Sequence, residues 1–553
     1  MTVKTILFAL FLFVGSLGRA IGATALGLDT AEWVSPSKEA VAQVEAMETA
    51  MAAMAKGETP AVTLQQAIDR MRGLAEEKND KDALFSIGFL AQQSQQPNAL
   101  DEAMKYYRRA ADLGQLQAMN NYGFILAGSG QGEEKAKEGL DQIKKAAEGG
   151  LNAARRNMAA IYLNGLAGEK RDPAAALAQL EKAAVGGDAQ AQFELAQFYV
   201  ELGGPEYTDD DKAWDWLNKA AEAGNPNALA TLGSVLFDGK KFGARQIEAD
   251  PAAAVEKFKK LADQGVPAGL RTMGELHVSG LGGVEKDFNK ALEYFAKAAE
   301  GNDPAAQVIL AGYYDKGVDL DPSDGKVEVA PNAVSALGLY RLAARNRVPL
   351  ALYNVGIFYE EGRAVDQDAE KAFAHFLQSA GVGFAPGMHK AGLYYLNGVG
   401  TLIDTVAAAG WFNRAAAAGL PEGFLSLGTM AEAGQLPSVG NISPAAVAAD
   451  AYRAVVQAPQ VGGQTRFEAL VRLGSLYSRG LLGEPGAAPA PDFENTYLCF
   501  KQASELAPDN AGVQQAVKES ASKLTPEQIS KADAAAAKAV AAWKSAPAAV
   551  GKE

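Results

Sequence analysis

The chain has 553 residues, of which 48% are hydrophobic and 21% are charged, and its formal net charge is −14 at pH 7. This acidic balance excludes the basic surface that non-specific nucleic-acid binding requires, so no nucleic-acid partner is expected. Because Cys499 is the single cysteine of the sequence, an intramolecular disulfide is excluded as well.

The first 25 residues have the pattern of a secretory signal peptide. Lys4 supplies the charged beginning, residues 6–14 are apolar, and Ala23-Thr24-Ala25 fits the small-x-small cleavage rule. We expect cleavage after Ala25 and a periplasmic or secreted mature protein. The apolar run is too short to span a membrane comfortably, and no later run reaches spanning length, so we expect no membrane span in the mature chain.

Residues 26–80 are expected to form an N-terminal helical cap. Ser35-Pro36-Ser37 can begin a helix that runs to Ala55, and the segment 57–60 contains Gly and Pro, which end it. A second helix is predicted over 64–77.

From residue 81 onward, one motif returns about every 36 residues, roughly eleven times, and such a period is typical of a solenoid built from helix pairs. Each unit begins with a small anchor residue, followed by an apolar residue and Gly or Ala four and five positions later. An aromatic or apolar residue follows at eight, and usually Gly at eleven. A second stretch, Ala-x-x-aromatic-aromatic-x-x-Ala-Ala, comes next. In the clearest unit these positions are Gly269, Met273, Gly274, His277, Gly280, Ala291, Tyr294, Phe295, Ala298 and Ala299.

With these residues, the chain resembles the Sel1-like repeat family of tetratricopeptide-repeat-like helical proteins over residues 81–507. The resemblance implies an all-α fold, a right-handed αα-superhelical solenoid of about eleven helix–turn–helix repeats with a concave face lined by first helices. Family members typically act as adaptors and scaffolds. In the secreted, cysteine-rich branch of the family, a disulfide cross-links each repeat. This chain lacks those cysteines.

The resemblance places positions two, six, nine and ten after each anchor on the concave face. Exposed apolar side chains among polar ones suit the recognition of a protein or peptide segment. The alternative is that several of them pack against the next repeat. The expected partner-binding residues are Phe85, Phe89, Phe193, Gln197, Arg271, Glu275, Tyr353, Ile357, Glu360, His389, Leu393 and Asn397.

Four insertions lengthen the connection between the two helices of a unit, at 240–250, 318–329, 435–443 and 482–492. Their Gly, Pro and Asp content predicts loops that share one edge of the solenoid. Residues 508–553 are expected to be capping helices and a tail, with helices over 512–523 and 526–543. In the second of these, Thr525 is the expected N-cap.

No residue pattern predicts a catalytic, cofactor-binding or metal site. His277 and His375 fall at aromatic positions of the repeat and are expected in the core, whereas His389 falls on the concave face as a lone imidazole. Cys499 is expected to be buried and inert. The acidic segment 319–325 departs from the EF-hand pattern, and the sequence leaves open whether it binds a cation.

We therefore expect an exported, non-enzymatic adaptor or scaffold that uses the concave face to bind a protein or peptide, in bacterial envelope assembly or regulation. This expectation draws on the family resemblance for its function. One alternative is a secreted factor that acts on a host or a neighbouring cell. A second alternative, a glycan- or cell-wall-active enzyme, is disfavoured because no carboxylate pair stands out from the repeat pattern.

Overall fold

The computed structural model describes residues 36–55, 58–94, 97–320, 328–436, 442–482 and 490–545. The expected signal peptide and the C-terminal tail lie outside the described residues. Most of the acidic segment 319–325 lies outside them too.

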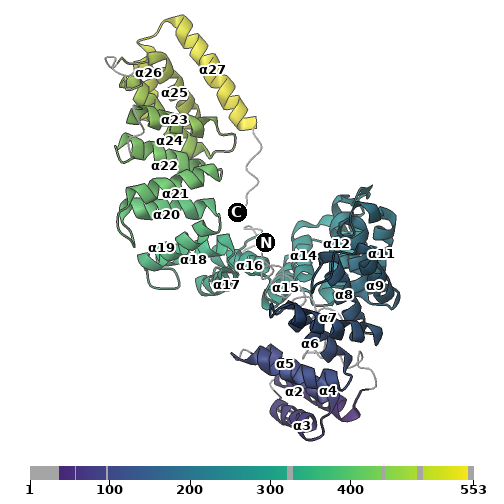
Figure 1. The fold of residues 1–553 in the computed structure, drawn as a ribbon. Coiled ribbons are helices and arrows are strands. Elements are labelled where there is room, and N and C mark those ends of the chain that lie inside the picture. Colours follow the sequence, from purple (N-terminus) through teal and green to yellow (C-terminus); the bar gives the residue numbers. More distant parts are fainter. Residues whose placement is uncertain are drawn as a thin grey trace. The chain divides into compact units, whose positions relative to one another are not determined.

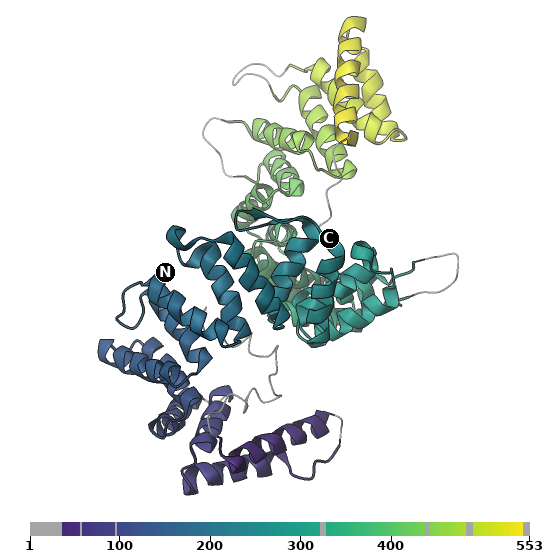
Figure 2. The ribbon, with the colours of Figure 1, turned by 90° about the vertical axis from the view of Figure 1, so that its right-hand side faces the viewer.

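The chain divides into two compact units, Met1–Asn302 and Asp303–Glu553, and each is considered by itself. Both units are stacks of antiparallel helix pairs (Figures 1 and 2). Along the described residues, eleven consecutive pairs run from α4/α5 to α24/α25, as the repeat predicts. The expectation of an all-α solenoid is confirmed.

Unit 1 begins with the pair α2 (Lys38–Ala55) and α3 (Leu64–Glu77), in agreement with the predicted helices. Six repeats follow, each with a first and a second helix. They are α4 (Lys81–Gln93) and α5 (Ala99–Asp112), α6 (Leu116–Gly128) and α7 (Glu133–Glu148), α8 (Asn152–Asn164) and α9 (Pro173–Val185), α10 (Ala189–Gln197) and α11 (Asp210–Glu222), α12 (Pro226–Asp238) and α13 (Pro251–Asp263), and α14 (Pro267–Ser279) and α15 (Phe288–Glu300). Shorter elements are a π-helical turn (Phe198–Leu202) and 3₁₀ turns (Pro205–Tyr207 and Leu281–Gly283).

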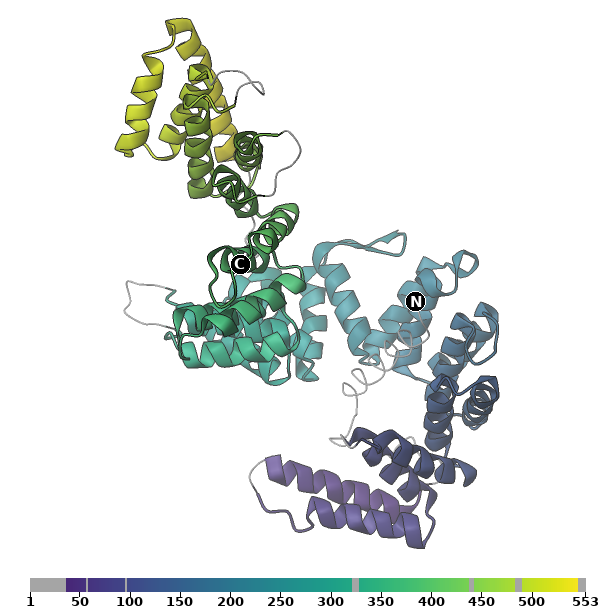
Figure 3. The ribbon, with the colours of Figure 1, turned by 60° about the vertical axis from the view of Figure 1, so that its left-hand side comes forward.

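Unit 2 holds five repeats and two terminal helices. The repeats are α16 (Pro304–Lys316) and α17 (Ala333–Arg345), α18 (Pro349–Glu361) and α19 (Ala369–Gly381), α20 (Ala385–Asn397) and α21 (Thr405–Ala417), α22 (Pro421–Glu432) and α23 (Pro444–Gln457), and α24 (Gly463–Ser478) and α25 (Phe493–Leu506). The terminal helices are α26 (Ala511–Ala521) and α27 (Pro526–Ser545), and α27 packs on α25 (Figure 3).

The turn between the helices of a repeat is set by its two end residues. In the α20/α21 repeat, Gly398 ends the first helix at φ 66°, a left-handed conformation that glycine adopts at little cost. Asp404 then begins the second helix, because its side chain accepts a hydrogen bond from the backbone N–H of Ala407 at 2.8 Å. Asp172, Asp209, Asp250, Asp287 and Asp368 cap other second helices in the same way.

The glycine five positions after the anchor lets the two helices of a repeat approach closely, as predicted. A Cβ atom placed on Gly274 would lie 2.7 Å from the ring of Phe295, which is closer than van der Waals contact permits. The same clash, at 2.6 Å, would occur between Gly356 and Phe376 and between Gly392 and Phe412. A ring of the second helix therefore occupies the space that a side chain on the first helix would need.

The buried aromatic position of the first helix is one residue earlier than predicted. In most repeats the residue seven after the anchor is buried, as with Phe358, which is fully buried, and Tyr394, which is 4% exposed. The residue eight after the anchor, such as Tyr359, is half-buried in most repeats, although Tyr199 and Ala431 are buried there. At 100° per residue, position seven returns to within about 20° of the anchor, whereas position eight lies about 80° away, at the edge of the contact.

The expected loop at 240–250 contains a short antiparallel hairpin, β1 (Lys241–Phe242) and β2 (Arg245–Gln246). The preceding repeat holds it in place. Asp210 accepts a hydrogen bond from the backbone N–H of Ala244 at 3.0 Å, and the ring of Phe242 lies 5.7 Å from that of Trp214. Both contacting residues lie in α11, and the whole of α12 separates α11 from the insertion along the chain. The local sequence therefore could not predict the hairpin.

Candidate partner-binding face

In both units, some first helices contact the first helix of the next repeat directly. Contacts between successive first helices, α6 with α8, α18 with α20 and α22 with α24, are more extensive than those between successive second helices. A stack curves toward the side on which its elements approach more closely. Within each unit, the first helices therefore line the inner side, which we call the first-helix face.

Polar side chains link neighbouring repeats across this face with a fixed spacing. The residue at position two after one anchor contacts the residue at position three after the next. Asn157 Nδ2 donates a hydrogen bond to Asn120 Oδ1 at 2.8 Å, and His389 Nε2 lies 2.9 Å from Ser426 Oγ. Arg156 Nη1 and Glu194 Oε1 form an ion pair of 3.6 Å at the same two positions.

A second link joins position nine of one repeat to position three of the next. Lys390 Nζ donates a hydrogen bond to Glu360 Oε2 at 2.6 Å, and Tyr394 donates to the other oxygen of Glu360 at 3.0 Å. Two repeats later than Glu360 and Lys390, Arg472 and Glu432 form an ion pair of 3.3 Å at the corresponding positions. Position three, which the predicted face did not include, thus belongs to the first-helix face.

Glu194 and His389 are two of the groups on this face whose pKa values are shifted. Burial raises the pKa of Glu194, and the positive charge of Arg156 opposes that rise. Burial lowers the pKa of His389, although the nearby carboxylate of Glu422 acts in the opposite direction. Both shifts follow from side chains that are crowded by neighbouring repeats.

Two of the predicted partner-binding residues are not available to a partner. Phe85 and Phe193 are only 5% and 7% exposed, so they pack within the solenoid. The ring of Phe85 lies 5.8 Å from that of Tyr107 in the second helix of the same repeat, and Phe193 belongs to a buried cluster with Leu217 and Leu229. For these two residues the expectation of an exposed face is wrong.

The other predicted residues range from half-buried to exposed. Tyr353 lies with its ring 5.5 Å from the rings of Phe376 and Phe384, and Arg271 pairs with Glu275 along one helix at 2.7 Å. The half-buried ones are Phe89, Gln197, Arg271, Tyr353, Ile357, Glu360, His389 and Leu393, and the exposed ones are Glu275 and Asn397. Binding by any of them stays a prediction.

His277 and His375, which were expected in the core, are only half-buried, and each stacks on a tyrosine. His277 stacks on Tyr294 at 5.7 Å, and His375 stacks on Tyr359 at the same separation. Cys499 is 5% exposed, and burial raises the pKa of its thiol to about 12, so the thiol is protonated at neutral pH.

His389 is not the isolated imidazole that the sequence suggested, because Ser426 lies within hydrogen-bonding distance. This pair lacks the surroundings of a hydrolase nucleophile. Ser426 lies inside α22, where backbone N–H groups bond along the helix and are unavailable to stabilise an oxyanion. Within the described part of the chain, no three His, Cys, Asp or Glu side chains are grouped to hold a metal ion.

None of the described helices is long and apolar enough to cross a membrane.

A shallow hollow of about 750 Å³ lies outside the first-helix face, in the turn between α18 and α19. It is lined by residues that include Tyr359, Asp366, Asp368 and Lys371.

With the helix pairs and the first-helix face established, comparison with known proteins gives the class. The Sel1 repeat family matches nine segments that together cover more than half of the chain, so the protein belongs to the Sel1 repeat family. Such proteins are generally protein-interaction scaffolds and bind other proteins. The matched segments are 82–115, 152–188, 189–225, 226–266, 268–303, 304–347, 349–383, 385–420 and 467–507. The pairs α6/α7 and α22/α23 have the same fold without a family match.

Among curated proteins, an uncharacterized protein of Neisseria meningitidis is 29% identical over 139 residues, which are 25% of this chain and 26% of that protein. Chitin synthase regulatory factor 3 of Schizosaccharomyces pombe is 27% identical over 309 residues, 55% of this chain and 28% of that protein. The chain thus matches only about a quarter of the length of either relative.

Among solved structures, a protective antigen of uropathogenic Escherichia coli with the SLR fold superposes with a TM-score of 0.57 at 24% identity, over 88% of this chain and 99% of that one. A Sel1 repeat protein of Oxalobacter formigenes has a TM-score of 0.45 at 28% identity, over 62% and 93% of the two chains. The first of these likenesses supports the solenoid fold.

Proposed function

We propose that the protein is an exported, non-enzymatic adaptor in a bacterial envelope whose first-helix face binds a protein partner. The observation that carries the proposal is the row of polar links across that face, which leaves half-buried aromatic and exposed polar side chains at repeating positions. Such a surface suits an extended or helical segment laid along it. The fungal relative, named as a regulatory factor of chitin synthase, is in keeping with a regulatory role.

The export step of the proposal is supported by the pattern of residues 1–25 and is tested on the mature protein. N-terminal sequencing should give Leu26 as the first residue. A chain that keeps Met1 and stays in the cytoplasm would rule out both the compartment and an envelope partner.

The binding step is tested by charge substitutions on the two sides of one repeat. Asn397 is exposed on the first helix of the α20/α21 repeat, and Asn413 is exposed on its second helix. Once a partner has been captured from the native envelope, Asn397→Arg should weaken its binding about tenfold, whereas Asn413→Arg should have no effect. Both side chains are solvent-exposed, so neither change should alter the fold.

A second matched pair tests unit 1. Glu275 is exposed on α14 and Glu293 is exposed on α15 of the same repeat. If the partner binds the first-helix face of this unit, Glu275→Arg should reduce affinity and Glu293→Arg should not. Equal effects of the two members in both pairs would mean that the partner does not use the first-helix face.

In the alternative, the protein is a secreted factor that acts on a host or neighbouring cell. It would use the same surface but would work outside the bacterial cell. It finds a parallel in the antigen of uropathogenic Escherichia coli, which shares the fold. Fractionation of cells and medium separates the two: recovery of the mature chain in the medium favours the alternative, and recovery in the periplasm favours the adaptor.

A further inference from the structure

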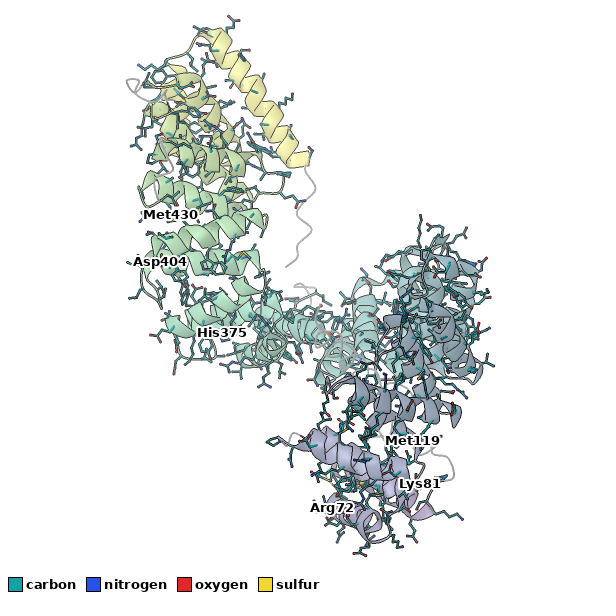
Figure 4. The ribbon with its side chains drawn as sticks, in the orientation of Figure 1. Arg72, Lys81, Met119, His375, Asp404 and Met430 are labelled. Carbon is teal, nitrogen blue, oxygen red and sulfur yellow. The ribbon has the colours of Figure 1, made fainter. Side chains whose placement is uncertain are left out.

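The turn between α20 and α21, together with the first turn of α21, exposes four large aliphatic side chains. Val399, Leu402, Ile403 and Val406 are 41%, 86%, 68% and 66% exposed. Single exposed aliphatic residues are ordinary on protein surfaces, but a contiguous group is not. We call these four residues the aliphatic turn. Asp404, which lies among them, is at the edge of unit 2 (Figure 4).

The fold itself does not require this turn to be aliphatic. The turn of the preceding repeat has the same length and the same ends: a left-handed glycine, Gly362, and an N-capping aspartate, Asp368. Thirty-six residues earlier, the four aliphatic positions are occupied by Arg363, Asp366, Gln367 and Glu370. Polar side chains therefore serve the same turn geometry, and the aliphatic residues need another explanation.

Acidic groups border the aliphatic turn. Gly400 lies so close to the start of α19 that a Cβ atom on it would meet the carbonyl of Ala369 and would lie 2.9 Å from the backbone nitrogen of Glu370. Glu370 and Asp366 are exposed at this junction, and Asp366 also lines the hollow between α18 and α19. The lysine of the hollow, Lys371, is already paired with Asp368 at 2.8 Å. The border of the turn is therefore negatively charged.

This combination of apolar surface and negative border identifies the kind of occupant. An anionic lipid surface would be repelled by Asp366, Glu370 and Asp404. A second copy of this acidic chain would bring the same charges together. In addition, four aliphatic side chains offer a few hundred Å² at most, whereas a stable dimer buries about 800 Å² per partner.

We propose that the aliphatic turn, with Asp366 and Glu370 beside it, is a second docking surface that takes a partner segment carrying aliphatic side chains next to lysine or arginine. The aliphatic side chains of the segment cover Leu402, Ile403 and Val406, and its cations lie against the two carboxylates. This surface lies on the turns rather than on the first-helix face, so the proposal stands independently of the proposed adaptor site.

The test uses the full chain and a labelled synthetic peptide of alternating leucine and arginine, with fluorescence anisotropy as the readout. Two comparison peptides separate the contributions: serine replaces leucine in one, and glutamate replaces arginine in the other. The wild-type chain should bind the leucine–arginine peptide at least about tenfold more tightly than either comparison peptide.

Two sets of substitutions locate the binding. The triple change Leu402→Gln, Ile403→Gln and Val406→Gln removes the apolar surface without changing charge, and should weaken binding about tenfold or more. The double change Asp366→Asn and Glu370→Gln should weaken binding and reduce its salt dependence. Val185→Gln, at a residue of unit 1 that is 79% exposed, is the matched control and should leave binding unchanged.

Circular dichroism should show the wild-type helix content in every variant, because all the substituted side chains are at the surface. Equal binding of the leucine–arginine peptide to the wild type and to the triple variant would overturn the proposal. So would self-association of the wild-type chain in sedimentation velocity that the triple variant abolishes, since the occupant would then be a second copy.

Discussion

At the scale of single residues, two glycines of one repeat differ in a way that only packing explains. A Cβ atom on Gly392 of α20 would lie 2.6 Å from the ring of Phe412, whereas one on Gly410 of α21 would meet nothing within 4 Å. We expect Gly392→Ala to destabilise the protein by about 1–3 kcal/mol, because the methyl group forces the helices apart. Gly410→Ala should be neutral or stabilising by up to about 1 kcal/mol, because alanine favours the helix. Urea unfolding of the two variants measures both, and equal midpoints would contradict the packing.

The thiol of Cys499 provides a second residue-scale prediction. Burial raises its pKa to about 12, and thiolate is the reactive form. Iodoacetamide at about pH 8 should therefore leave the native chain unmodified, and the same reagent should alkylate Cys499 completely in urea. Mass spectrometry distinguishes the two. Rapid alkylation of the folded chain would mean that the packing around α25 opens readily.

Two histidines should make stability depend on pH. Burial lowers the pKa of His375 and of His389 below the usual 6.5. The unfolded chain therefore binds protons at a higher pH than the folded chain, and this contribution to stability is present above about pH 6.5 and is lost as the pH falls below it. The urea midpoint should drop between about pH 7.5 and about pH 5.5.

The double variant His375→Gln and His389→Gln is the control for this prediction. It should reduce the drop in the urea midpoint, leaving the part that comes from carboxylates. A drop of unchanged size in the double variant would show that neither imidazole contributes.

At the scale of elements, α27 covers the last repeat through a few specific contacts. Tyr497 of α25 donates a hydrogen bond to Asp533 of α27 at 2.8 Å, and the guanidinium of Arg466 lies 4.6 Å above the ring of Trp543. Arg466 is only 3% exposed. We expect Trp543→Ala to cost about 1–3 kcal/mol, because it removes the ring that covers a buried cation.

Lys544→Ala, at the exposed neighbour of Trp543, is the matched control and should change stability little. Hydrogen exchange with mass spectrometry should show increased exchange in α27 and α25 for Trp543→Ala alone. Unchanged exchange in that variant would mean that α27 is held by its other contacts.

At the scale of the whole molecule, the boundary between Asn302 and Asp303 separates two compact units. Each unit has its own buried clusters, for example the one around Tyr107 in unit 1 and the one around Phe358 in unit 2. Because each repeat packs on its neighbours, we expect residues 36–302 and 303–545 to fold as separate fragments with helix content close to that of the full chain. Circular dichroism and calorimetry check this, and an unfolded fragment would mean that the repeats act as one cooperative array.

The 36-residue period was enough to predict the helix pairs and the close approach at Gly274, because every repeat must bury the same stripe against its neighbours. The terminal helices α2, α3 and α27 were also predictable, since their breaking and capping residues are adjacent in sequence. A local sequence pattern predicts contacts only within one helix pair.

What joins one repeat to the next was decided by the tertiary structure. Arg156 pairs with Glu194, and His389 contacts Ser426, although the two residues of each pair belong to different repeats. A pattern within one repeat does not show such contacts, so the predicted face did not include position three. The burial of Phe85 and Phe193, the hairpin at 241–246 and the exposure of Leu402 depend on how closely the neighbouring helices stack. Periodicity determines which residues share a stripe, whereas the distance between stacked helices determines which of those residues reach solvent or each other.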